Sequence, residues 1–407
     1  MTPQRRWPVI SALGIVQILA WGCSYYLLTV LGPAIAAETG WGLPWIFGSL
    51  TAGMLVAGLV SPFVGRQIGR RGGRPVLAVS ALLLAAGLTL LGLAPGLPVF
   101  GLAWLVIGAG MGAGLYDAAF ATLGRLYGAD ARPAITALTL WGGFSSTLCW
   151  PLSAFLLAQL GWRGTCLVYA AVQLLVSLPL IVGLIPPVPP RPAAPGRPDA
   201  APLDPAERPT FLVLAAIVTC TGVAASVFSV HLLTLLQERG LSLAAAVSLG
   251  TLVGPSQVGA RLLEVANRSR HHPIWTLTLA VGLMAVGLVL LWAGLGAPGV
   301  VLMVYGAGNG LYSIARGTLP LVLFGPDRYA ALLGRLAKPS LAAQALAPSA
   351  AAYLIARGGA DAALAALAVL GLVDVALVAV LWWVRRRGAA RVPAGSSEKP
   401  LPQGGRG

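Results

Sequence analysis

The chain has 407 residues, and its composition argues against a water-soluble protein. Hydrophobic residues make up 57% of it, charged residues only 10%, and the mean hydropathy is +0.83. Soluble domains carry roughly a quarter charged residues, so a large soluble enzyme, a disordered protein and a disulfide-stapled secreted domain are not expected. The net charge of +15 sits in short loops between apolar runs and forms no basic-aromatic patch, so nucleic acid is not an expected partner.

Twelve apolar runs follow one another along the chain and predict membrane-spanning helices. About 20 helical residues at 1.5 Å each cross a hydrocarbon core about 30 Å thick. The runs lack the period-2 alternation of barrel strands, so we expect an all-α membrane protein. The predicted spans are Val9–Leu31, Trp45–Val64, Pro75–Ala94, Leu97–Leu123, Ile135–Leu160, Thr165–Ile185, Phe211–Leu236, Leu241–Leu263, Ile274–Leu295, Val300–Phe324, Ala330–Ile355 and Ala362–Val384.

The basic residues predict the orientation of these spans. Of the 27 Lys and Arg residues, 23 lie at one set of span ends, and Arg163, Arg239 and Arg357 lie in the opposite loops. Cytoplasmic loops carry the excess of basic residues. We therefore expect a multi-pass protein of the cell inner membrane with both termini in the cytoplasm.

The chain divides into four predicted regions. Residues 1–185 form a six-helix half, and residues 210–387 form a second one. Between them, 186–209 holds ten prolines, which predicts a stiff, solvated cytoplasmic linker. Residues 388–407 are polar and predict a disordered tail.

The two halves share an internal repeat. Residues 114–123 read GLYDAAFATL and residues 310–319 read GLYSIARGTL, with six of ten positions identical. A second match pairs SYYLLT at 24–29 with SVHLLT at 229–234. Both matches relate a span to the one six spans later, which preserves direction. Parallel halves of this kind are a transporter architecture.

A glycine- and arginine-rich loop after the second span, GRQIGRRGGR at 65–74, resembles the signature loop of the Major Facilitator Superfamily, and Gly161-Trp162-Arg163 resembles another recurrent feature. The resemblance covers the chain from the first span to the last. It implies a bacterial secondary transporter with pseudo-symmetric halves that rock in the bilayer around a central cavity lined by spans 1, 4, 7 and 10. The chain's shape also resembles the monocarboxylate and oxalate porter branch. A monomer without a cofactor or enzymatic activity is expected. The expected gating residues are Gly65, Arg66, Arg70, Gly73 and Arg74.

Two departures from the family pattern stand out. Gly69 occupies a position where the family usually has an Asp, which would cap a helix N-terminus and pair with arginine. The antiporter signature of span 5 keeps Gly142, Gly143 and Pro151 but is interrupted by other residues. The direction of transport is therefore not indicated by motif.

Asp117 and Arg316 are the most informative polar residues, because each lies within an apolar span. On insertion scales such a charge costs about 2.5–3.5 kcal/mol at a helix centre, so the two side chains should be paired or hydrated. The resemblance places both in the central cavity. We predict that Arg316 binds an anionic group or locks the carrier through Asp117, and that Asp117 is a candidate proton site. The alternative is a static ion pair between helices.

The sequence gives less support for a functional role of the remaining candidate residues. His231 is a second candidate for proton coupling or an ordinary hydrogen-bonded core residue. Arg261 and Glu264, three residues apart, predict an ion pair at the cytoplasmic gate. Asp374 in the last span has no explanation from sequence. The candidates for substrate contact or for packing between the halves are Gln17, Trp21, Tyr25, Tyr116, Asn309 and Tyr312.

Other functions remain open at this stage. An efflux carrier for a drug or an arsenical is one alternative, since thiols suit trivalent arsenic, although Cys23, Cys149, Cys166 and Cys220 are scattered and more typical of buried core thiols. A non-transporting membrane receptor with a carrier fold is another. No metal site is predicted. The chain has no GxxxxGK[ST] loop, so ATP-driven transport by this chain is not expected.

Overall fold

A computed structural model describes residues 6–189, 203–267 and 271–390, and every regular element among them is helical. The first half of the chain contains α1 (Arg6–Gly22), α2 (Leu27–Thr39), α3 (Leu43–Arg71), α4 (Gly73–Gly92), α5 (Leu97–Gly114), α6 (Tyr116–Tyr127), α7 (Ala131–Gly143), α8 (Ser145–Val172) and α9 (Leu178–Leu184). The second contains α10 (Arg208–Glu238), α11 (Leu243–Gly250), α12 (Val253–Ala266), α13 (Pro273–Ala293), α14 (Pro298–Phe324) and α15 (Pro326–Ala390).

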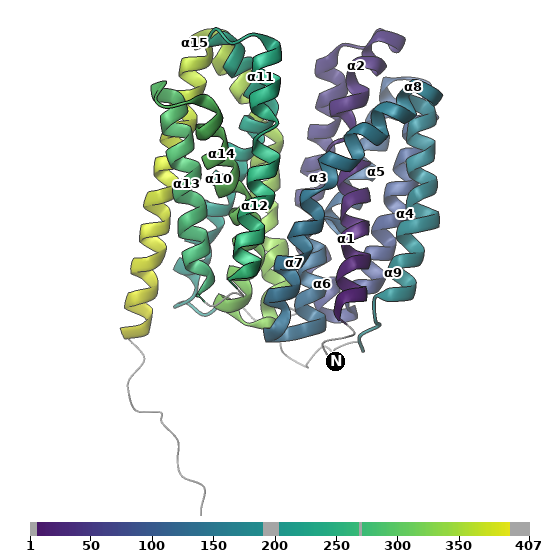
Figure 1. Ribbon diagram of the computed structural model, residues 1–407. Coiled ribbons are helices and arrows are strands. Elements are labelled where there is room, and N and C mark those ends of the chain that lie inside the picture. Colours follow the sequence, from purple (N-terminus) through teal and green to yellow (C-terminus); the bar gives the residue numbers. More distant parts are fainter. Residues whose placement is uncertain (1–5, 190–202, 268–270, 391–407) are drawn as a thin grey trace, which may run out of the picture.

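The helices form two bundles that stand side by side (Figure 1). One bundle holds α1 to α9 and the other holds α10 to α15. Each bundle has its own apolar interior. One hydrophobic cluster draws all its residues from 211–381, and two others draw theirs mainly from residues 9–185. The internal repeat of the sequence therefore corresponds to two packed units.

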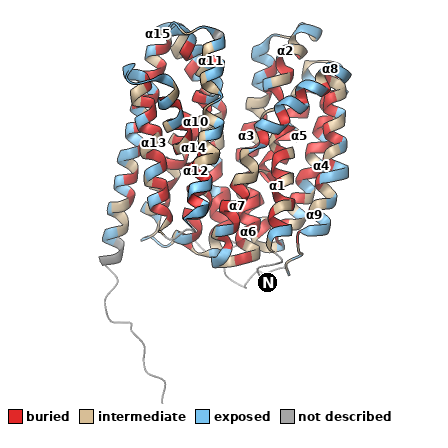
Figure 2. Cartoon of the chain, viewed as in Figure 1, coloured by how far each residue is buried: buried red, intermediate tan, exposed pale blue. Residues whose placement is uncertain are grey.

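The outside of both bundles is apolar as well as the inside. Buried residues fill the bundle interiors (Figure 2), yet large side chains such as Leu175, Leu263 and Trp45 are 75%, 74% and 68% exposed. Among the described residues, seven helical stretches are long and apolar enough to cross a membrane. Two of them, 88 and 62 residues long, far exceed one crossing and are interrupted where Gly161 and Gly359 adopt positive φ. An apolar exterior of this extent fits lipid rather than water.

Several spans that the sequence predicts as continuous are broken in the structure. Breaks fall between α1 and α2, between α7 and α8, and between α11 and α12. In the fourth predicted span, Leu115 is extended and separates α5 from α6. A side chain replaces part of the lost helical hydrogen bonding, because Gln17 Nε2 donates to the Gly114 carbonyl at 2.6 Å.

The described ends of the predicted linker are attached to the two bundles. Arg125 Nη2 donates to the Pro189 carbonyl at 3.1 Å, and Arg328 donates two 2.6 Å hydrogen bonds to Glu207 at the start of α10. Residues 190–202, which hold five of the linker's ten prolines, lie outside the described residues. The predicted tail begins too early, because α15 continues to Ala390; residues 391–407 also lie outside the described part.

The Glu207–Arg328 pair gives a testable pH dependence. Hydrogen bonds from Arg328 lower the pKa of Glu207 below its usual value. The pair's contribution to stability is therefore complete above the unfolded pKa of about 4.3 and is lost as the pH falls through the lower folded pKa. We expect Glu207→Gln to cost about 0–1 kcal/mol at neutral pH, as for other partly exposed pairs, and nothing in strong acid. Thermal unfolding in detergent across this range checks it, and an equal cost at every pH would contradict it.

Candidate functional site

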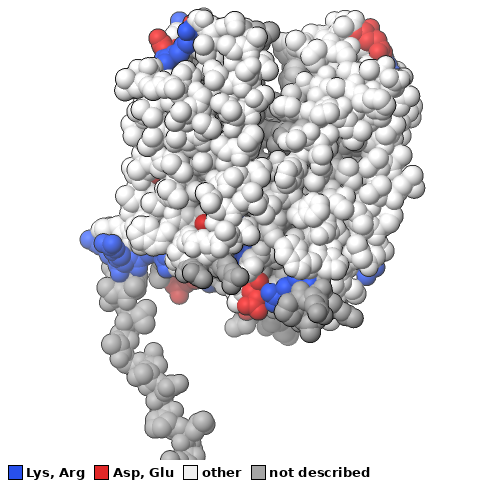
Figure 3. All heavy atoms as spheres, viewed as in Figure 1, with Lys and Arg blue, Asp and Glu red and all other residues white. Residues whose placement is uncertain are grey.

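A central cavity of about 210 Å³ lies between the two bundles. Seen from outside, the surface is hollowed between the bundles at the end of the molecule opposite the N-terminus (Figure 3). Both bundles contribute to the wall. The lining residues of the first bundle include Trp21, Tyr25, Tyr26, Ser61, Tyr116, Asp117 and Phe120, and those of the second include Ser226, Gln257, Arg261, Asn309, Tyr312, Arg316 and Gln344.

Asp117 and Arg316 form an ion pair across this cavity wall. Arg316 Nη2 lies 2.6 Å from Asp117 Oδ2, and the side chains are 18% and 16% exposed. Asp117 stands in the first turn of α6, directly after the break at Leu115, so the partial positive charge of the helix N-terminus also favours its carboxylate. Arg316 comes from the uninterrupted α14. One ion pair therefore links the two bundles at the cavity.

Aromatic rings form the cavity wall beside Asp117. The ring of Trp21 lies 5.4 Å from that of Tyr25 and 5.4 Å from that of Tyr116, in edge or tilted contacts. Tyr116 also stacks on Phe120 at 5.1 Å. Gln17, which the sequence suggested as a candidate for substrate contact or for packing between the halves, is fully buried and does not line the cavity. Its amide supports the broken α5–α6 junction instead.

The facing wall is polar. Asn309 and Tyr312 line it as the sequence suggests, and the Tyr312 hydroxyl donates to the Val218 carbonyl of α10 at 3.1 Å. Sequence reasoning missed Ser226, Gln257 and Gln344, which line the same wall. All three are uncharged polar residues within apolar runs, and this feature of the sequence could have identified them.

His231 lies outside the cavity lining. Its Nε2 is 2.9 Å from the carbonyl oxygen of Pro348 in α15. This contact matches the alternative of a hydrogen-bonded core histidine. The four cysteines are likewise absent from the cavity lining, and no group of His, Cys, Asp and Glu among the described residues is arranged to hold a metal ion.

Arg261 and Glu264 both lie at the contact between the bundles, but the described hydrogen bonds and ion pairs do not join them to each other. Arg261 lines the cavity and donates to the Thr139 carbonyl of α7 at 3.0 Å, to the Gly310 carbonyl at 3.3 Å and to Gln257 at 3.4 Å. The predicted partner is therefore replaced by backbone oxygens, one of them in the other bundle. A spacing of three residues permits an ion pair on a helix but does not exclude better partners on neighbouring helices.

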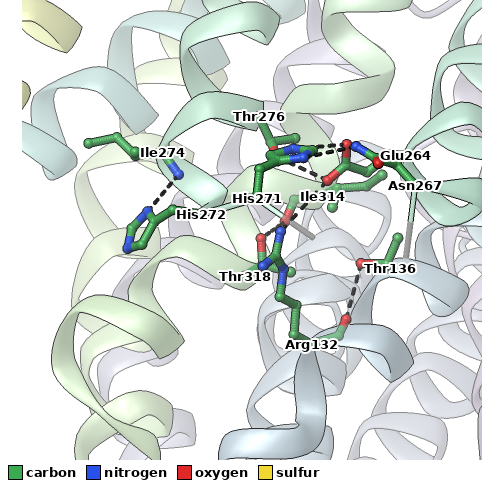
Figure 4. A network of polar contacts seen from close by, with 10 residues as sticks. All are labelled: Arg132, Thr136, Glu264, Asn267, His271, His272, Ile274, Thr276, Ile314 and Thr318. Carbon is green, nitrogen blue, oxygen red and sulfur yellow. Dashed lines mark hydrogen bonds and ion pairs between the residues drawn. The ribbon is translucent and has the colours of Figure 1, made fainter. Parts of the chain in front are cut away.

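Glu264 belongs to a separate polar network in which residues of both bundles take part (Figure 4). Arg132 Nη2 of the first bundle approaches its Oε1 at 3.8 Å, and His271 Nε2 approaches its Oε2 at 3.4 Å. The Thr276 hydroxyl donates to Oε1 at 3.0 Å, and Asn267 contacts His271 at 2.9 Å. Glu264 is only 7% exposed, so its charge is compensated by partners from both bundles.

We expect Glu264→Gln to weaken this contact between the bundles. Loss of the carboxylate removes the ion pair with Arg132 and the contact with His271 within a buried network, for which we expect a cost of about 1–3 kcal/mol of unfolding free energy. Thermal unfolding of the detergent-solubilised protein measures the change. Glu38→Gln is a matched control because its ion pair with Arg163 is exposed, and such pairs contribute about 0–1 kcal/mol. Equal effects of both substitutions would contradict the role given to Glu264.

The bundles are packed tightly at the arginine-rich end of the molecule, which is the end that carries the N-terminus and most of the Lys and Arg residues (Figure 1). A Cβ atom added at Gly65 of α3 would lie 2.3 Å from the Ala330 carbonyl oxygen of α15, and one at Gly334 would lie 2.2 Å from that of Ser61. The helices therefore touch at backbone distance below the cavity. The cavity is closed at this end, and Figure 3 shows the hollow at the other.

The expected gating residues lie at the closed end but do not form a loop, because α3 continues to Arg71 and α4 begins at Gly73. Gly65, Arg66 and Arg70 belong to α3, and Gly73 and Arg74 belong to α4. A Cβ atom at Gly73 would collide with Thr122 of α6, at 1.9 Å from its hydroxyl oxygen, so this glycine permits close packing. Arg66 is exposed, and Arg70 and Arg74 are half-buried. Gly69 has open space where a Cβ would stand, and its carbonyl accepts a 3.2 Å hydrogen bond from Arg125 Nε.

A sequence model of the Major Facilitator Superfamily matches residues 13–337, most of the chain. The chain belongs to this superfamily. It is therefore a multi-pass membrane protein and a transporter, not an enzyme. A relative from Thermoproteus tenax, described as an uncharacterized 38 kDa protein in a 23S RNA operon, is 30% identical over 403 residues, which cover 98% of this chain and 99% of the relative.

Solved structures of superfamily members share the fold. The human organic anion transporter MFSD10 (TETRAN) superimposes with a TM-score of 0.73 at 18% identity, covering 93% of this chain and 100% of that one. The proton:xylose symporter XylE gives 0.73 at 11% identity, covering 93% and 96%. The Escherichia coli fucose:proton symporter FucP gives 0.68 at 13% identity, covering 91% and 98%. At these identities the similarity shows the fold and leaves the cargo of this superfamily member open.

Proposed function

We propose that this superfamily member is a proton-coupled secondary carrier of a small organic anion. The Asp117–Arg316 ion pair carries the proposal, because it joins the two bundles at the wall of the central cavity. A guanidinium ion binds a carboxylate through two parallel hydrogen bonds, so Arg316 suits a substrate carboxylate. Asp117 then plays two parts: it is the partner of Arg316 in the empty carrier and a proton acceptor in the loaded one.

The coupling follows from competition for Arg316. A substrate carboxylate that pairs with Arg316 displaces Asp117, which is left in a poorly solvated cavity without its cation. Burial penalises an unpaired charge, so Asp117 takes up a proton. Anion and proton are then bound together, and the ion pair between the bundles is released. Unloading on the other side of the membrane reverses both steps.

Alternating access requires the bundles to separate at one end while they close at the other. We propose twelve crossings in two six-helix halves, with a cytoplasmic linker over 186–209. The interruptions at Gly161 and Gly359 support this count, because each divides a run too long for one span. The excess of basic residues supports a cytoplasmic location of the closed end and of both termini in the inner membrane. The observed cavity then faces outward.

Flux in proteoliposomes tests this function. Full-length protein is given radiolabelled lactate, oxalate, L-fucose or D-xylose, with and without an inward proton gradient. We expect gradient-driven accumulation of a carboxylate, its loss with a protonophore and its loss in Arg316→Gln. Uptake of the sugars but of neither carboxylate, or an Arg316→Gln variant that transports like the wild type, contradicts the proposal. Saturable binding without flux would instead support a receptor.

A further inference from the structure

Asp374 is a buried acid that the proposed transport cycle does not use. It lies in the last part of α15, is 4% exposed and is absent from the lining of the central cavity. The Thr221 hydroxyl of α10 donates to its Oδ2 at 2.5 Å, and its Oδ1 has no hydrogen-bond partner. No Lys, Arg or His of the described chain forms an ion pair with it. A permanently charged carboxylate in such a place would be very costly.

Within the described part of the chain, no cationic side chain forms an ion pair that would hold Asp374 charged. The titratable side chains that interact electrostatically with it include Cys220 on α10 and Tyr312 on α14. Helix α13 carries no titratable side chain. Between residues 362 and 384 of α15, Asp374 is the one titratable residue. One turn before it, a Cβ atom at Gly371 would meet Ala285 of α13 at 3.1 Å, which shows how tightly this part of α15 is packed.

Thr221 can serve Asp374 in both charge states. A hydroxyl is a donor and an acceptor. It donates to the carboxylate, as observed, or it accepts a hydrogen bond from the neutral carboxyl group while its own proton turns back to a carbonyl of α10. A carboxyl group that carries a proton on one oxygen also explains why Oδ1 has no donor directed at it.

Helix α10, which carries Thr221, also contributes to the wall of the central cavity. Gly222, next to Thr221, lines the cavity, and so does Gln344. Gln344 Nε2 donates to Ser340 Oγ at 2.8 Å, and both Ser340 and Tyr312 donate to the Val218 carbonyl at 3.1 Å. Val218 precedes Thr221 by one helical turn. Polar groups therefore lead from the cavity to the turn of α10 that carries Thr221.

We propose that Asp374 and Thr221 form a second proton-binding site, behind the α10 wall of the cavity, whose proton is exchanged with the cavity during transport. The exchange is a simple ionisation: the carboxyl O–H bond breaks, the proton passes to water in the cavity, and the carboxylate that remains accepts the Thr221 hydrogen bond. A sodium ion is less suitable, because the site offers one carboxylate and one hydroxyl. The inference rests on the proposed proton-coupled transport, which it extends from one proton site to two.

Infrared difference spectroscopy tests the site without a transport substrate. Spectra of the full-length protein in liposomes are compared between acidic and alkaline buffer. We expect a carboxyl C=O band that disappears in alkali. Asp374→Asn should remove it, and Thr221→Val should shift it. Asp117→Asn should leave it in place. Thr219→Val is the matched control, because the Thr219 hydroxyl donates to the Ala215 carbonyl of its own helix. Identical wild-type and Asp374→Asn spectra, or a band that persists at every pH, overturn the proposal.

Flux measurements then separate this inference from the function on which it rests. Asp374→Asn should retain exchange of labelled for unlabelled substrate and lose accumulation driven by the proton gradient. Accumulation equal to that of the wild type overturns the second site and leaves the proposed function intact. A wild type that moves neither lactate nor oxalate counts against the proposed function, whereas the infrared band still decides whether Asp374 binds a proton. A band shift on adding sodium chloride would favour a cation site and likewise overturn the proposal.

Discussion

Neutralising one member of the Asp117–Arg316 pair is expected to destabilise the protein more than neutralising both. Asp117→Asn leaves a largely buried guanidinium without its carboxylate, and Arg316→Gln leaves the reverse. Breaking such a pair costs about 3–5 kcal/mol, whereas replacing both charges is often close to neutral. The lower end of that range applies, since both side chains face the cavity and keep 16% and 18% exposure. Thermal or chemical unfolding of the two single variants and the double variant gives the coupling energy.

The double variant also distinguishes an ion pair that only stabilises the fold from one that takes part in transport. A pair that only holds the bundles together is dispensable once both charges are gone, so Asp117→Asn with Arg316→Gln would then transport normally. The proposed cycle predicts a stable protein that does not accumulate a carboxylate. Asp361→Asn is the matched control, because the Asp361 side chain is 80% exposed in its ion pair with Arg239, so its loss should cost under about 1 kcal/mol. Additive effects of the single substitutions would contradict a coupled pair.

The membrane fold and the outline of the site were accessible from sequence because both depend on strong local signals. Apolar runs separated by arginine-rich loops predict a helical membrane protein, and the superfamily match confirms it. The repeat and the resemblance placed Asp117 and Arg316 in one cavity, where the structure finds them paired at 2.6 Å. A charge within an apolar span is conspicuous, since few environments can satisfy it.

Other features could not be predicted because they depend on partners far away in the chain. The break at Leu115 relies in part on Gln17, 97 positions before the carbonyl to which it donates. Glu264 pairs with Arg132 rather than with its neighbour Arg261 because helices of the two bundles meet there. The Thr221–Asp374 hydrogen bond joins residues 153 positions apart, which is why Asp374 had no explanation from sequence.

Enlarging Gly65 is expected to open the closed end of the carrier. A Cβ atom at this position would lie 2.3 Å from the Ala330 carbonyl oxygen, and backbone cannot move aside as a flexible side chain can. Gly65→Leu must therefore push α3 away from α15. Overpacking costs about 1–3 kcal/mol, comparable with the few kcal/mol that separate two conformations of a protein. The population should therefore shift toward the state in which these helices are apart.

Spin labels at Arg71 on α3 and Arg335 on α15, in a background with the four cysteines replaced by serine, report the separation of these helices. Both side chains are exposed, so the labels themselves do not disturb the contact. Gly65→Leu should lengthen the distance between the labels. Gly69→Ala is the matched control on the same helix, because a Cβ there meets nothing within 4 Å, and it should leave the distance unchanged. An unchanged distance in Gly65→Leu would mean that the α3–α15 contact does not determine which end of the cavity is closed. A longer distance would identify this glycine contact as the closure on which alternating access depends.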